Sequence, residues 1–190
     1  MLTNDSFTWP VSFSCVVVIG DLILPNSYNL TIGMSPASTQ NAAVLGFKKV
    51  KQFINTFVHY TMIAKDDHPI LSHFPLSIST NTIQLPQDPY DYFFSAVLFR
   101  KLSAITQNHL IIQHIALDSS VGDHIQYQVN SSCNAYSNVL DQENKWWNSD
   151  TLSTNHVDKF PSWETFDIST PQKFHPKIIK GGKCEGEQVR

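Results

Sequence analysis

Charge is sparse in this chain of 190 residues, and neither sign dominates. Charged residues make up 15% of the sequence, and thirteen lysines and arginines stand against sixteen aspartates and glutamates, for a net charge of -3. Proteins that bind nucleic acid usually carry a basic field or stripe, so we expect no nucleic-acid partner. The one basic stretch without an acidic residue, residues 173–183, holds four lysines and is interpreted as solvated charge in a tail.

Long apolar runs and secretion signals are also missing. The apolar run at residues 15–19 is far too short to span a bilayer, which takes about 20 residues. The first residues carry no positive charge of the kind that opens a secretory signal peptide. We expect a protein that neither enters a membrane nor is secreted.

Cysteine and glycine are few, and their spacing excludes several kinds of site. The three cysteines, Cys15, Cys133 and Cys184, form no Cys-x-x-Cys pair, which is typical of a protein in a reducing compartment without a zinc knuckle. The sequence contains no Gly-x-Ser-x-Gly nucleophile turn and no glycine-rich phosphate or dinucleotide loop. We therefore expect no metal and no cofactor, and the leading interpretation is a protein that is not an enzyme.

Helical patterns occur twice in the chain. Apolar residues recur every three or four positions from Ala43 to Phe57, which predicts a helix over residues 40–64 with Ser38 or Thr39 as its N-cap. Asp88 as a cap and a proline in the first helical position predict a second helix over residues 89–107. The second helix is apolar on more of its surface, so we expect it to be the more buried of the two.

Strand patterns surround these helices. Apolar or alternating runs predict strands at residues 11–19, 28–34, 80–85, 109–117 and 124–129. The last two are expected to form an antiparallel hairpin, with Ile125, Tyr127 and Val129 facing the core. The order of the elements predicts a single α+β domain, in which two helices pack on one face of a mostly antiparallel sheet.

The C-terminal third of the sequence loses this periodicity but keeps its aromatic residues. We divide the chain into an α+β domain at residues 1–130, an irregular arm at 131–176 and a flexible tail at 177–190. Large rings are costly to expose, so we expect the arm to pack on a partner protein or a second copy of the chain. The alternative is that the arm covers its own domain. The predicted interface residues are Trp146, Trp147, Phe160, Trp163 and Phe166.

Histidines and aspartates gather around the last predicted hairpin and offer a rival interpretation. His114 and Asp118 can share one face of a strand, and the following turn can bring Asp123 or His124 back towards Asp118. Two carboxylates with histidine can bind a divalent cation or orient water for hydrolysis, which would make the protein a metal-dependent hydrolase or nuclease. The simpler interpretation is that both aspartates stabilise the turn.

Several segments of the sequence together resemble one group of viral proteins. The resemblance rests on residues 25–34, 88–91, 98–105 and 119–123, on Tyr127 and on the Trp146–Trp147 pair, and it covers roughly residues 17–150. These segments are similar to small uncharacterised proteins encoded by large tailed bacteriophages. The resemblance carries no catalytic residue. It implies a virus-encoded protein that works in the host cytoplasm or in the virion.

Overall fold

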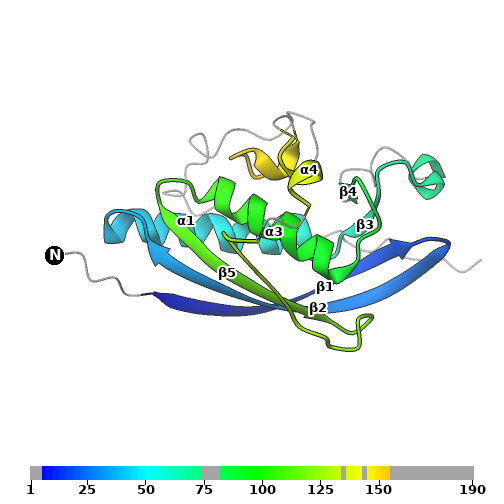
Figure 1. Ribbon diagram of the computed structural model, residues 1–190, viewed down its shortest axis with the longest axis horizontal. Coiled ribbons are helices and arrows are strands. Elements are labelled where there is room, and N and C mark those ends of the chain that lie inside the picture. Colours follow the sequence, from blue (N-terminus) through cyan, green and yellow to red (C-terminus); the bar gives the residue numbers. More distant parts are fainter. Residues whose placement is uncertain (1–5, 74–81, 134–135, 143–144, 155–190) are drawn as a thin grey trace, which may run out of the picture.

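The computed structural model describes residues 6–73, 82–133, 136–142 and 145–154, and these form one α+β domain built on a six-stranded sheet with the strand order β4-β3-β1-β2-β5-β6 (Figure 1). The strands are β1 (Phe7–Ile19), β2 (Leu22–Pro36), β3 (Met62–Lys65), β4 (Thr82–Leu85), β5 (Leu110–Ser119) and β6 (Tyr127–Asn130). The main helices are α1 (Gln40–Phe53) and α3 (Asp91–Ile105), with shorter helices η1 (Ile54–Val58), η2 (Pro69–His73), α4 (Ser137–Leu140) and η3 (Trp146–Asn148). The expected fold class is therefore confirmed.

Both long helices cover the same face of the sheet, and none of the described helices covers the other, which we call the open face (Figure 1). Strand residues that point towards the helices, such as Phe13, Leu30 and Ile115, are buried, which follows from the period-2 alternation of a strand with one covered face. The open face carries small and polar side chains, among them Ser12 and Asn29. The central strands thus carry buried apolar side chains on the face towards the helices and small or polar side chains on the other face.

The sheet contains antiparallel and parallel pairs, and both parallel pairs involve β3, a strand that the hydrophobic periodicity of the sequence did not predict. Pairs β1–β2, β2–β5 and β5–β6 are antiparallel, whereas β1–β3 and β3–β4 are parallel. The helix expected to reach residue 64 ends at Val58, and Tyr60, with φ +59°, turns the chain towards β1. The Tyr60 amide donates to the Ser14 carbonyl at 2.7 Å, and residues 62–65 then pair with β1 as a strand. The prediction failed there because this partner is far away in the sequence.

Helix α3 confirms the expected deeper burial but begins later than predicted. Its first residue is Asp91, its N-cap is Tyr90 without a side-chain cap bond, and Asp88 does not cap it. The Asp88 carbonyl instead accepts the Tyr90 amide at 2.8 Å, in a turn that precedes the helix. Helix α3 contacts β5 and β6 on one side and η3 on the other, so it is buried on nearly every face.

The last hairpin also differs from its prediction. Strand β6 begins at Tyr127 rather than at residue 124, because Asp123 and His124 both adopt positive φ, 52° and 58°. Ile125 is 57% exposed instead of facing the core, whereas Val129 is buried as expected. Of the predicted arm, the described residues up to Thr154 include α4 and η3. Most of the arm and the whole predicted tail lie outside the described residues.

Candidate functional site

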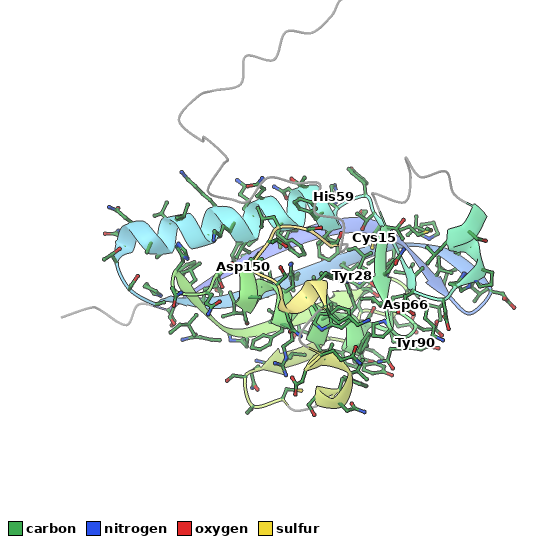
Figure 2. The ribbon with its side chains drawn as sticks, turned by 90° about the horizontal axis from the view of Figure 1, so that it is seen from above. Cys15, Tyr28, His59, Asp66, Tyr90 and Asp150 are labelled. Atoms are coloured by element: carbon green, nitrogen blue, oxygen red, sulfur yellow. The ribbon has the colours of Figure 1, made fainter. Side chains whose placement is uncertain are left out.

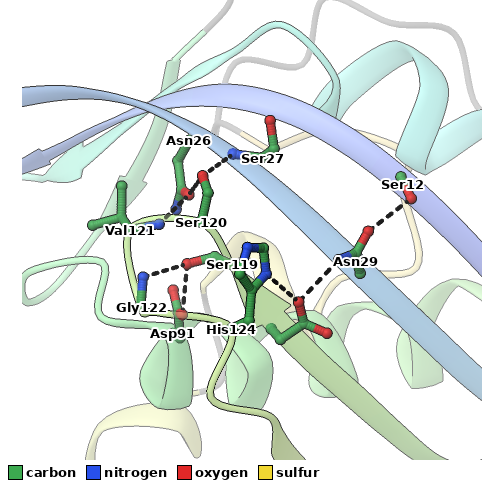
Figure 3. A network of polar contacts seen from close by, with 11 residues as sticks. Ser12, Asn26, Ser27, Asn29, Asp91, Ser119, Ser120, Val121, Gly122 and His124 are labelled. Atoms are coloured by element: carbon green, nitrogen blue, oxygen red, sulfur yellow. Dashed lines mark hydrogen bonds and ion pairs between the residues drawn. The ribbon is translucent and has the colours of Figure 1, made fainter.

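A row of polar side chains crosses the open face of the sheet and includes part of the predicted catalytic set (Figure 3). Ser12, Asn29 and Asp118 occupy matching positions on β1, β2 and β5. The Ser12 hydroxyl donates to Asn29 Oδ1 at 2.9 Å, and Asn29 Nδ2 donates to Asp118 Oδ1, also at 2.9 Å. His124 Nδ1 lies 3.2 Å from the same Asp118 oxygen. This contact agrees with the expectation that the turn brings His124 back towards Asp118.

This row lacks the contacts of an activated nucleophile. The Ser12 hydroxyl is bonded to an amide oxygen, which is not a base, and it makes no hydrogen bond to His124. A serine nucleophile is usually activated by a base within hydrogen-bond reach of its hydroxyl. His124 is 65% exposed and Asp118 14% exposed, so the pair forms an ion pair at the surface when the histidine is protonated. Surface pairs of this kind contribute about 1 kcal/mol or less.

The structure brings together only two of the four predicted catalytic residues. His114 lies on the same strand as Asp118 but four residues away, roughly 13 Å at about 3.3 Å per strand residue. Its ring covers Gly33, where an added Cβ would lie 2.2 Å from His114 Cε1. Asp123 has a left-handed backbone in the turn. Within the described ranges, no group of three or more His, Cys, Asp or Glu residues is placed to hold a metal ion.

The Asn26 side chain and the Ser27 backbone, both of β2, bind the loop after β5 that carries His124 (Figure 3). Asn26 Oδ1 accepts the Ser120 hydroxyl at 2.9 Å and the Val121 amide at 3.0 Å. The Ser27 amide donates to Ser120 Oγ at 3.1 Å, and the Ser120 amide returns a bond to the Ser27 carbonyl at 3.0 Å. These four bonds hold the loop in one position against the hairpin.

A second polar cluster lies under the same loop, inside the domain. Asp91, in the first turn of α3, accepts the Ser119 hydroxyl at 2.7 Å, and Ser119 Oγ accepts the Gly122 amide at 3.0 Å. Burial raises the pKa of Asp91, and the bond from Ser119 opposes that rise. Burial likewise raises the pKa of the Tyr28 phenol beside it and raises the pKa of the Cys15 thiol to about 12. Neither the Cys15 thiol nor the Tyr28 phenol is therefore prepared as an anionic nucleophile at neutral pH.

Gly122→Ala is expected to destabilise the protein by about 1–3 kcal/mol, the usual cost of forcing a group into a packed site. A Cβ at Gly122 would lie 2.2 Å from Asp91 Oδ2, which is less than van der Waals contact. Urea titration measures the loss. In Gly122→Ala combined with Asp91→Ala, the carboxylate that clashes is absent, so the double variant should lose less than the sum of the single variants. Strictly additive losses would contradict this explanation.

A cluster of four tyrosines lies where α3 begins, next to the edge strand β6. Its members are Tyr90, Tyr92, Tyr127 and Tyr136, and we call it the tyrosine surface. Tyr92 lies at its centre, with ring centroids 6.1 Å from Tyr90, 6.0 Å from Tyr127 and 5.5 Å from Tyr136. Tyr90 and Tyr92 are 46% and 39% exposed, although their side chains are large and aromatic. Exposed aromatic groups of this kind are typical of protein interfaces.

Negative charge collects at the end of the domain where the tyrosine surface lies. Strands β1, β3, β4 and β5 run in the same direction, so the residues that follow them lie towards the same end of the domain, although β5 ends opposite Tyr28 and β1 runs on to end opposite Leu22. Asp66 and Tyr90 lie towards this end in Figure 2, and Asp150 lies away from it. Of the acidic residues that the structure describes, all but Asp141 and Asp150 belong to this end: Asp21, Asp66, Asp67, Asp88, Asp91, Asp118 and Asp123. Lys65 is the one described lysine or arginine that accompanies them.

The two tryptophans of the predicted interface pack inside the protein's own domain. Trp146 and Trp147 are 5% and 2% exposed. The Trp146 indole donates to the Gln84 carbonyl of β4 at 3.1 Å, and the Trp147 indole donates to the Leu140 carbonyl of α4 at 3.0 Å. In this structure both rings are buried within the chain's own domain, and their role at an interface stays a prediction. Phe160, Trp163 and Phe166 lie outside the described residues.

Lys101 of α3 joins this C-terminal segment to the helix, and its role was missed in the sequence. Its ammonium donates to the carbonyl oxygens of Trp146, Ser149 and Thr151 at 2.6, 2.9 and 2.7 Å. Burial lowers the pKa of Lys101 to about 7, and Asp150 opposes that shift. The sequence did contain a signal, since Lys101 follows Leu98 by three positions and therefore lies on the apolar side of the helix.

Comparison with known proteins adds no identification. The sequence matches no known protein family and no curated protein. No helix among the described residues is long and apolar enough to cross a membrane. The function must therefore be argued from the geometry of this chain.

Proposed function

We propose that this protein is a non-enzymatic interaction or assembly protein whose binding surface is the tyrosine surface. The observation that carries the proposal is the exposure of Tyr90 and Tyr92 beside an edge strand. Tyrosine supplies a large apolar area and a polar hydroxyl at a small entropic cost, and a few such rings often carry most of the energy of an interface. The predicted arm contributes Tyr136 to this surface, while its tryptophans stabilise the fold.

The surroundings of the tyrosine surface support a binding role. Val121 and Ile125, in the loop after β5, are 37% and 57% exposed. The hydrogen bonds from Asn26 and Ser27 hold this loop in place, so a partner would meet a preorganised surface rather than a segment that must first be ordered. The partner is a second copy of the chain or another protein. As part of the same proposal, and in keeping with the resemblance of the sequence to bacteriophage proteins, the interaction takes place in the host cytoplasm or the virion.

The rival function, metal-dependent hydrolysis, has one observation in its favour, the contact between Asp118 and His124. A catalytic zinc site takes three protein ligands and an open position. His114 lies roughly 13 Å along the strand from Asp118. Among the described residues, no third His, Cys, Asp or Glu joins the pair in a group that could hold a metal ion. We therefore prefer the interaction function.

Photo-crosslinking from position 92 tests the proposed function. With benzoylphenylalanine in place of Tyr92, we expect one dominant intermolecular adduct in the cells that naturally contain the protein, identified by mass spectrometry as a second copy or one other protein. The same substitution at Tyr60 is the matched control, because Tyr60 is 78% exposed but lies outside the tyrosine surface. An adduct yield at position 92 no greater than that at position 60 would contradict the proposal.

A further inference from the structure

The tyrosine surface and the acidic residues around it suggest the chemistry of what binds there. Asp88 precedes Tyr90 by two residues. The exposed Asp123 follows Gly122, and Gly122 lies against Asp91 in the first turn of α3. Tyrosine rings attract cations over their faces, and nearby carboxylates add Coulomb attraction. A segment that fits this surface carries lysine or arginine together with apolar side chains that can cover the rings.

The chain itself contains such a segment beyond the described residues. Residues 173–183 hold no acidic residue. Between their lysines stand three apolar residues, Phe174, Ile178 and Ile179. The four lysines are Lys173, Lys177, Lys180 and Lys183. The charge of this segment is therefore opposite to that of the acidic end of the domain, and its apolar residues match the exposed rings.

The length of the intervening chain permits this contact within one molecule. Residues 155–172 separate the last described residue, Thr154, from the lysine segment, and fully extended they span roughly 60 Å. A domain of about 150 residues has a radius of gyration of only about 15 Å. A tethered segment that can reach its site is present there at an effective concentration of roughly millimolar, which favours the same chain over a second copy.

We propose that residues 173–183 of the chain dock on its own tyrosine surface and cover it until a partner displaces them. The inference rests on the proposed function, because it makes the tail a competitor for the same surface. It also gives the partner a chemistry, namely a cationic segment interspersed with apolar residues.

Zero-length carbodiimide crosslinking of the purified full-length protein tests the docking. The reagent joins lysine amines to carboxylates in contact, and mass spectrometry identifies the pairs. We expect the lysines of residues 173–183 to crosslink to Asp88 and Asp123 several-fold more than to Asp150. Addition of 0.5 M salt should weaken this preference, because it shortens the range of attraction between exposed charges to about 3–5 Å. Asp150 is a stringent reference, since it is exposed and closer to the tail in the chain.

Two variants and an isotope mixture complete the experiment. Tyr90→Ala with Tyr92→Ala should abolish the preference for Asp88 and Asp123, and Tyr60→Ala should keep it. If circular dichroism shows the double variant unfolded, Tyr90→Ala alone replaces it, because Tyr90 is the more exposed of the two. In a mixture of ¹⁴N and ¹⁵N protein, crosslinks should join peptides of the same isotope only.

The inference is overturned if the tail lysines prefer Asp150, if the tyrosine variants keep the crosslinks, or if mixed-isotope pairs show that the tail docks on a second copy. None of these results decides the proposed function. An intermolecular adduct from position 92 in cells can persist when the tail makes no contact, and tail crosslinks can persist when no such adduct forms.

Discussion

Replacing Lys101 with alanine is expected to lower the free energy of unfolding by about 3–5 kcal/mol. The substitution removes the donor for three backbone carbonyls of the C-terminal segment. It also opens a void beside the rings of Phe53 and Trp146, whose centroids lie 5.9 and 5.7 Å from the ammonium. A urea titration followed by tryptophan fluorescence measures the loss.

Two controls separate the charge of Lys101 from its packing. Lys101→Met keeps most of the aliphatic volume and should cost less, about 1–3 kcal/mol, because only the hydrogen bonds are lost. Arg100→Ala removes the neighbouring cation, whose pair with Asp141 lies at the surface, and should cost about 1 kcal/mol or less. A loss from Lys101→Ala as small as that from Arg100→Ala would contradict the role of Lys101.

The pH dependence of stability gives an independent check on Lys101. Its pKa is about 7 in the native state, whereas an unfolded chain keeps the ordinary value near 10.4. Between these values the unfolded state binds more protons, so this group makes the free energy of unfolding rise with pH from about 7 to about 10. Urea titrations across this window should show the wild type gaining stability relative to Lys101→Met. A constant difference between the two proteins would show that the pKa of Lys101 is not lowered.

Trp147→Ala is expected to cost about 3–5 kcal/mol, as is usual for removing a buried aromatic ring. The ring is almost fully buried against the protein's own domain, and its indole nitrogen bonds to the Leu140 carbonyl. If Trp147 instead served an interface with a partner, the variant would unfold at nearly the wild-type urea concentration. Urea titration together with the mass in solution distinguishes the two roles.

Trp147→Phe is the matched control for this prediction. Phenylalanine keeps much of the buried ring and removes the indole donor. The Leu140 carbonyl keeps a partner, because Asn148 Nδ2 also donates to it at 2.6 Å. The loss should therefore be clearly smaller than for alanine. Equal losses for the two substitutions would indicate that the hydrogen bond, and not the buried area, holds Trp147 in place.

The elements that the sequence predicted correctly are those fixed by local patterns. The N-cap at Thr39 is confirmed, with its side chain accepting the Ala42 amide at 3.3 Å. The strand expected at residues 80–85 appears as β4, and the apolar stripe through Val50 and Ile54 is buried. Each of these depends on residues within a few positions of one another, where periodicity and capping act directly.

The candidate site was predicted in part. The proximity of His124 to Asp118 followed from a short turn between them, and the structure has it. The tyrosine surface was not predicted, because its members come from α3, from β6 and from the start of α4, and only the Tyr90-x-Tyr92 spacing is local. Bringing them together requires the antiparallel pairing of β5 with β6 under the helix.

By itself, the sequence determined the α+β class, two helices with apolar stripes and the order of most strands, because hydrophobic periodicity and turn residues act over short distances. Only the tertiary structure decided three further features. It turned residues 62–65 into a strand parallel to β1 through backbone bonds to a distant partner. It enclosed Trp146 and Trp147 in the chain's own core, and it gave Lys101 three carbonyl acceptors. The deciding contacts join residues far apart in the sequence: Val16 pairs with Met62, the Lys101 ammonium bonds to the Trp146 carbonyl 45 residues away, and the Trp146 indole bonds to the Gln84 carbonyl 62 residues away. No local pattern bears on such separations.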